Sequence, residues 1–156
     1  MARQSYFAEM KYQNRNPMFF NNVKEQDLRN AVKRIVKDIK HDNIDQEDYV
    51  YFQNESVLNA CITESEYQWK HAKIMESTLS AYRNECLYRR SVIQYQTFDN
   101  ATELMHVGNE LTRQTKKCNC WKTIYEAFYS IKYYHTGIRQ TLSVIKNLDF
   151  RGIEDL

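Results

Sequence analysis

The stretch that decides the fold is residues 58–93, LNACITESEYQWKHAKIMESTLSAYRNECLYRRSVI. It contains no Gly or Pro, and small or apolar residues recur in it at alternating spacings of three and four. That period predicts one helix from about Asp48 into the mid-90s, about 70 Å long, with a coiled-coil-like seam along one face. A lone helix of that length cannot bury its own seam, so the seam must lie against another element. The seam positions are Leu58, Cys61, Ser65, Gln68, Ala72, Met75, Leu79, Tyr82, Cys86 and Ile93.

A second long helix is predicted after a break at residues 97–100. Asn100 and Glu103 have the spacing of a helix cap and its capping-box partner. The apolar stripe continues as far as Ile145, and Gly137 marks a bend or a close contact within it. Its positions are Leu104, Val107, Leu111, Cys118, Trp121, Tyr125, Phe128, Ile131, Ile138, Leu142 and Ile145.

The short break makes the two long helices antiparallel neighbours. Pairing them about the centre of the break places Trp69 near Phe128 and Leu79 near Cys118. This register is a geometric prediction that the structure can test.

A shorter helix is predicted at residues 23–40, with a capping box formed by Asn22 and Glu25. One face of it carries Leu28, Val32, Ile35 and Ile39. Residues 1–21 show no sustained period and are expected to form an extended N-terminal arm, whereas 147–156 form a frayed or partner-bound tail. The expected fold is therefore a single all-α domain over residues 1–156, with one short helix and two long helices packed as an antiparallel coiled-coil-like hairpin.

The composition fits few, long elements. Among 156 residues there are three Gly and one Pro, and the formal net charge is +2. Near-neutrality gives no bulk electrostatic reason to expect nucleic acid or an anionic membrane as a partner. No apolar run approaches the length of about 20 residues that a spanning helix needs, and the first residues lack the apolar core of a secretory signal. Twelve Tyr suit half-buried interfaces, although an AT-rich genome would also favour Tyr, Asn, Lys and Ile.

Residues with chemistry do not form a catalytic pattern. Cys118 and Cys120 are a poor chelating pair, since residues two apart on a helix point in different directions. The cysteines Cys61, Cys86, Cys118 and Cys120 are either buried thiols of the seam or, in an oxidising compartment, disulfide partners. No glycine-rich phosphate loop is present, and the four histidines form no recognisable triad. We expect no enzyme activity, no cofactor and no metal.

Basic residues gather at three places in the chain, and tyrosines lie near some of them. Basic grooves with aromatic platforms hold single-stranded nucleic acid, but the charged outer faces of long helices explain the same clusters, so nucleic acid is an unlikely partner. The clusters are Lys33–Arg34–Lys37, Arg89–Arg90 and Arg113–Lys116–Lys117.

Within the long seam, residues 61–72 read CITESEYQWKHA and resemble the Cys-x-x-Glu-x-Glu-x-Gln-Trp-Lys run of PDSW-type accessory subunits of mitochondrial respiratory complex I. Two further cysteines of that family are replaced here by Asn54 and Phe98. The resemblance implies a structural subunit without redox centres, peripheral to the mitochondrial inner membrane on its intermembrane-space side, that braces the other subunits of a large membrane complex. The partner interface it implies consists of Glu64, Glu66, Gln68, Trp69 and Lys70.

The C-terminal part of the chain is similar to another family. Trp121 near the start of the last apolar run, and residues 143–150, SVIKNLDF, resemble phage UvsY-type recombination mediators. Those are helical oligomers that bind single-stranded DNA and load a recombinase. The alternative functions are therefore a mediator of that type or a scaffold subunit of another mitochondrial assembly.

Overall fold

The computed structural model describes residues 4–14, 16–92, 98–151, 153 and 156. Its described residues are helical or connect helices, and none of them forms a strand. In chain order the elements are α1 (Tyr6–Gln13), the 3-10 helix η1 (Pro17–Asn22), α2 (Glu25–Lys40), the 3-10 helix η2 (Gln46–Gln53), α3 (Glu55–Val92), α4 (Phe98–Tyr133) and α5 (Ile138–Lys146). The all-α prediction is confirmed.

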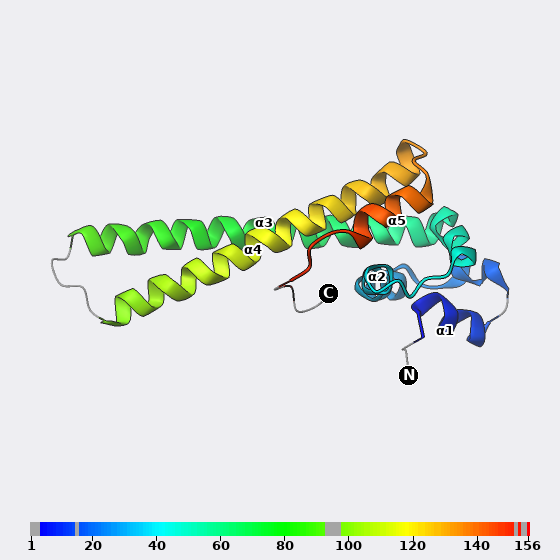
Figure 1. The fold of residues 1–156 in the computed structure, drawn as a ribbon, viewed down its shortest axis with the longest axis horizontal. Helices are drawn as coiled ribbons and strands as arrows, with labels where there is room; N and C mark the ends of the chain where they lie inside the picture. The colour runs from blue at the N-terminus through cyan, green and yellow to red at the C-terminus, as the bar shows by residue number, and fades with distance from the viewer. Residues whose placement is uncertain (1–3, 15, 93–97, 152, 154–155) are drawn as a thin grey trace.

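Two regions make up the molecule in Figure 1. The long helices α3 and α4 run in opposite directions and pack against each other. The other elements gather around the first part of α3 and the last part of α4, and we call this region the body. The remaining halves project from it, and we call residues 73–92 and 98–117 the stalk. In the view of Figure 1, α4 crosses α3 obliquely.

The body contains the core. Its largest fully buried side chains come from the chain up to Val57 and from Trp121 onward, so both ends of the sequence contribute to one apolar cluster. They include Phe7, Phe20, Leu28, Ile35, Phe52, Val57, Trp121, Ile124, Phe128 and Ile145. The body is therefore held together by contacts between residues distant in sequence.

The N-terminal residues are not an extended arm, as the lack of a period suggested. Ser5 caps α1 by accepting a hydrogen bond from the Ala8 N–H at 3.1 Å. Phe7 of α1 stacks on Tyr51 of η2, with ring centroids 5.0 Å apart, and meets Phe20 of η1 edge-on. Aromatic packing against distant elements holds these short helices, which a periodicity argument does not detect.

Helix α2 was placed correctly, but its predicted cap was wrong. Its N-cap is Lys24, which makes no side-chain capping bond, so the expected box of Asn22 and Glu25 does not form. Glu25 and Asp27 in the first turn stabilise this end through the helix dipole instead. The expected apolar face from Leu28 to Ile39 is buried.

The boundaries of the long helices also differ from the prediction. Residues 46–53, expected to lie mainly in the long helix, form η2, and α3 begins at Glu55. Asp48 instead lies buried in η2, where its carboxylate accepts from the Asp45 N–H at 3.1 Å and from Lys11 Nζ at 2.5 Å. Asn100 lies inside the first turn of α4, which begins at Phe98, so it does not cap the helix.

The second long helix is interrupted near Gly137. Helix α4 ends at Tyr133, and His135 adopts a left-handed backbone with φ of 54°. This turn lets α5 fold back against α4 and α2. The tail is part of the core, because Phe150 and Ile153 are buried. Neither a continuous helix nor a frayed tail is found.

The predicted register of α3 and α4 is off by about one helical turn. Trp69 stacks on Tyr125 rather than lying near Phe128, and Phe128 stacks on Phe52 of η2. The break lies earlier than expected, between Val92 and Phe98, and this shifts every facing pair.

Candidate functional site

The most distinctive surface feature is a continuous row of aromatic rings, the aromatic strip, formed by Trp69 of α3 and by Tyr125, Tyr129, Tyr133 and Tyr134 at the end of α4. Trp69 and Tyr125 stack with centroids 5.5 Å apart, and Tyr125 lies 5.7 Å from Tyr129. Tyr129 in turn lies 4.3 Å from Tyr133 and 5.9 Å from Tyr134. Three of the tyrosines are spaced four apart, so they follow one face of α4.

Lysines lie at both ends of the strip. Lys73 and Lys122 each place Nζ 6.0 Å from the Trp69 ring centroid, and Lys132 lies 5.2 Å from that of Tyr133. Ammonium groups at these distances are attracted to the faces of the rings. The strip therefore combines flat apolar surfaces with positive charge.

Glu66 places a carboxylate beside the strip, near Tyr125. Glu66 accepts a hydrogen bond from Lys70 Nζ at 2.6 Å, and this bond raises the pKa of Lys70. Burial, followed by the nearby charge of Glu66, raises the pKa of Tyr125. The Tyr125 hydroxyl hence remains a neutral donor around pH 7.

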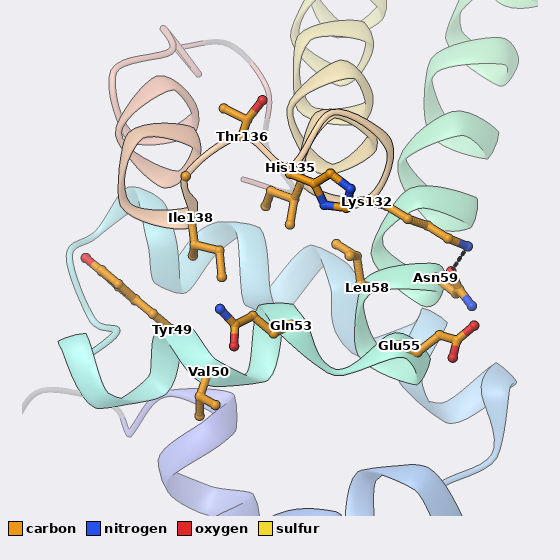
Figure 2. A pocket seen from close by; sticks show the side chains of 12 residues that line it. Tyr49, Val50, Gln53, Glu55, Leu58, Asn59, Lys132, His135, Thr136 and Ile138 are labelled. Atoms are coloured by element: carbon orange, nitrogen blue, oxygen red, sulfur yellow. Dashed lines mark hydrogen bonds between the residues drawn. The ribbon is translucent and has the colours of Figure 1, made fainter.

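The strip ends beside a pocket of about 710 Å³, shown in Figure 2. Leu58, Ile131 and Ile138 supply apolar lining. Lys132 crosses one side of the pocket and donates to Asn59 Oδ1 at 2.5 Å. The remaining lining residues are Tyr49, Val50, Gln53, Glu55, His135, Thr136 and Gly137.

The five residues predicted as a partner interface fall into two groups in the structure, one that makes contacts within the chain and one at the surface. Glu64 accepts from Arg29 Nε of α2 at 3.1 Å, and Gln68 donates to Glu64 at 3.0 Å while its side chain is buried. These two residues serve contacts within the chain. Glu66, Trp69 and Lys70 remain on or near the surface, and all three belong to the strip or its edge.

The four cysteines are free thiols in this structure. Cys61 and Cys86 both lie on α3 and are about 37 Å apart at 1.5 Å per residue, far beyond the reach of a disulfide. Cys118 and Cys120 occupy different faces of α4, and burial raises the pKa of both thiols. In the part of the chain that the structure describes, no three His, Cys, Asp or Glu side chains form a group that could hold a metal ion.

Among the described residues, no helix combines the length and the apolar character needed to cross a membrane.

Comparisons of the chain with family models, with curated proteins and with solved structures find no match.

The sequence did not predict the strip, although part of its signal was present. The spacing of Tyr125, Tyr129 and Tyr133 is visible in the sequence, but only the packing of α3 on α4 brings Trp69 to the end of that row. Lys122 and Lys132 belong to none of the basic clusters noted there.

Proposed function

We propose that the protein is a non-catalytic structural subunit that joins other chains through the surfaces of its stalk and of the adjoining turns of α3, residues 66–70. The stalk carries this proposal. Of its side chains that the structure describes, only Val107 and Gln114 are buried, whereas Ile74, Leu87 and Met105 are exposed. A projecting helix pair that buries so few of its own side chains is stabilised further when other helices pack against it.

The setting that we propose first is a mitochondrial respiratory complex, on the strength of the sequence resemblance over residues 61–72. The chain would then lie on the intermembrane-space side of the inner membrane, peripheral to it. Cys61, Ser65 and Ala72 of this stretch are buried within the chain, so the partner contact would involve Glu66, Trp69 and Lys70.

Native-gel fractionation of the tagged chain, with identification of comigrating proteins, tests this setting. We expect migration in a large membrane complex with respiratory subunits. Trp69→Ala should release the chain from that complex without loss of helicity, because the Trp69 ring is only partly buried and lies in the aromatic strip. A small oligomer free of membrane proteins would refute the respiratory setting.

A second candidate function, a single-stranded-DNA-binding recombination mediator, is favoured by the aromatic strip. Nucleic-acid bases stack on exposed aromatic side chains, and each contact contributes about 1–3 kcal/mol, while lysines bind the phosphates. The strip supplies rings and ammonium groups side by side. The Ser143–Phe150 resemblance to UvsY-type mediators supports the same function from the sequence.

Fluorescence anisotropy with a labelled oligothymidine tests this second function. We expect binding that weakens steeply with salt, as neutralised phosphates require. Tyr133→Ala should weaken it about tenfold or more. Tyr12→Ala is the matched control, because Tyr12 is 86% exposed on α1, away from the strip. Absence of binding at low salt, or equal effects of the two variants, would exclude this function.

A further inference from the structure

A row of exposed residues runs along one face of α3, and this face is not the one that packs against α4. Its members are spaced alternately four and three apart, and all are exposed. Tyr67, Ile74 and Tyr88 are 53%, 63% and 69% exposed. We call this row the outer stripe, and it consists of Tyr67, His71, Ile74, Thr78, Ala81, Glu85 and Tyr88.

The outer stripe continues a face of α3 that is used inside the body. At the body end of this face, α2 packs on α3 through Arg29, which pairs with Glu64 and lies over the Tyr67 ring. The stalk then extends well beyond α2 (Figure 1). Helix α4 packs on a different side of α3, where Trp69 meets Tyr125. The outer stripe is therefore the same kind of face as the one that α2 covers in the body. Along the stalk, α2 does not cover it.

The stripe is complementary to itself when reversed. If a second α3 lies antiparallel on it with a twofold axis beside Thr78, Tyr67 faces Tyr88 of the second copy. Ile74 then faces the small Ala81 of the second copy, so that a large side chain meets a small one. Each contact occurs twice, as an isologous interface requires.

The charges select the same orientation. Lys70, which pairs with Glu66, lies at one end of the stripe, and Glu85, which pairs with Arg89, lies at the other. The antiparallel pairing brings Glu85 of the second copy beside Lys70, whereas a parallel pairing would place Lys70 beside Lys70 and Glu85 beside Glu85. Like charges in contact oppose association, so the parallel arrangement is disfavoured.

A groove at the body end of the stripe is available for the tip of the second stalk. It has a volume of about 360 Å³ and is lined by residues of both α2 and α3. In the antiparallel pairing, the Tyr88 ring of the second copy reaches this level of α3. An aromatic ring in a groove at the end of a helix contact is a common form of interface anchor. The groove residues are Arg29, Thr63, Glu66, Tyr67, Lys70, His71 and Ile74.

We infer that the outer stripe is the interface of a twofold symmetric, antiparallel dimer of this chain. This inference goes beyond the proposed function and does not depend on its setting, since the same dimer forms whether the chain serves a respiratory complex or a DNA-binding assembly.

Sedimentation analysis of the purified full chain, from low to high micromolar concentration, tests the dimer. We expect the mass to rise with concentration toward twice the chain mass of 18.8 kDa. Lys70→Glu and Glu85→Lys should each weaken the dimer about tenfold or more, because each creates two like-charge contacts across the twofold axis. Asn109→Glu, an exposed position on α4, is the control and should leave the dimer unchanged.

Mixing the two charge variants gives the sharpest result. In a heterodimer of Lys70→Glu with Glu85→Lys, both cross-contacts are again between opposite charges, so the mixture should dimerise about as well as the unaltered chain. Circular dichroism of each variant checks that the helices remain intact. A chain that stays monomeric at every concentration, or a dimer that neither charge variant weakens, would overturn the inference. So would variants that fail to recover on mixing.

Discussion

Asp38 shows how one buried residue can fix the position of a short helix. Its carboxylate accepts a hydrogen bond from the Tyr6 N–H at 2.7 Å, at the start of α1, and the Asp38 side chain is buried in α2. A carboxylate at a helix N-terminus satisfies an otherwise unpaired N–H and interacts favourably with the helix dipole.

Replacing Asp38 should therefore release α1. We expect Asp38→Ala to lower the free energy of unfolding by about 2–3 kcal/mol, since a buried N–H loses a charged acceptor. Urea denaturation measures the change. The control is Glu126→Ala, at an exposed position on α4, which should stay within about 0.5 kcal/mol of the unaltered chain. Equal effects of the two variants would show that the contact does not hold α1.

Two buried acidic groups make stability sensitive to alkaline pH. Burial raises the pKa of the Cys61 thiol from 9.0 to about 12, and burial raises the pKa of Tyr6 from 10.0 to about 12. The unfolded chain releases these protons first, so the stabilisation is complete below about pH 9 and is lost as the pH rises toward 12. Tyr6→Phe should flatten this decline, whereas Tyr12→Phe, at an exposed tyrosine, should not. The urea midpoint of unfolding, measured at several pH values across that range, tests this. If the midpoint falls with pH equally for Tyr6→Phe and for the unaltered chain, the Tyr6 hydroxyl does not cause the decline.

At the scale of elements, the end of α2 is held by a backbone motif in which an unusual residue occupies the left-handed position. The Asn43 N–H donates to the Asp38 carbonyl at 2.8 Å and the Asp42 N–H donates to the Ile39 carbonyl at 3.2 Å, the pattern of a Schellman motif. Asp42 has φ of 56°, where glycine is usual. This turn directs the chain from α2 into η2.

Glycine at this position should stabilise the protein. We expect Asp42→Gly to raise the free energy of unfolding by about 0.5–1 kcal/mol through relief of the left-handed strain. The variant also loses the exposed ion pair of Asp42 with Lys146, at 3.2 Å, which contributes little. Asp42→Ala is the matched control, because it removes the same carboxylate but keeps the strain. If both variants lower the melting temperature equally, the ion pair matters more than the turn.

Helix α3 has more than one face that requires cover. Its seam meets α4, a second face meets α2 at the body, and the outer stripe continues along the stalk. A helix with apolar residues on several sides shows no single amphipathic stripe, which is typical of elements packed between neighbours.

At the scale of the whole molecule, the C-terminal segment closes the body. Phe150 is buried, with Lys40 Nζ of α2 lying 5.2 Å from its ring centroid. Lys40 also donates to the Leu148 carbonyl at 2.7 Å. The last residues therefore connect to α2 across 108 residues of sequence.

Phe150→Ala should destabilise the whole body. We expect a loss of about 3–4 kcal/mol, as for other large-to-small changes in protein cores. Val144→Ala on α5, where the side chain is largely exposed, is the control and should cost less than about 1 kcal/mol. Thermal and urea unfolding measure both variants. A loss below 1 kcal/mol for Phe150→Ala would mean that the tail does not pack as described.

The sequence by itself determined the helical class, the position of α2 and the buried positions 58, 61, 65, 68 and 72 of α3. These features depend on local periodicity, which each segment carries without reference to the rest of the chain. Residues 58–92 show this most clearly, since their spacing predicts the helix that they form in α3. Ile93, the last predicted seam position, lies outside the described residues.

Only the tertiary structure decided three features: the burial of the two chain ends, the register between α3 and α4, and the complete aromatic strip. Phe7, Phe20 and Phe150 are buried by partners far away in sequence, and no period announces such contacts. Side-chain packing between α3 and α4, together with the position of the break, aligns Trp69 with Tyr125. A register predicted from the position of the break alone therefore differs from the observed one by about one helical turn. That alignment adds Trp69 of α3 to the row of tyrosines at the end of α4, so the complete strip forms only when the two helices pack.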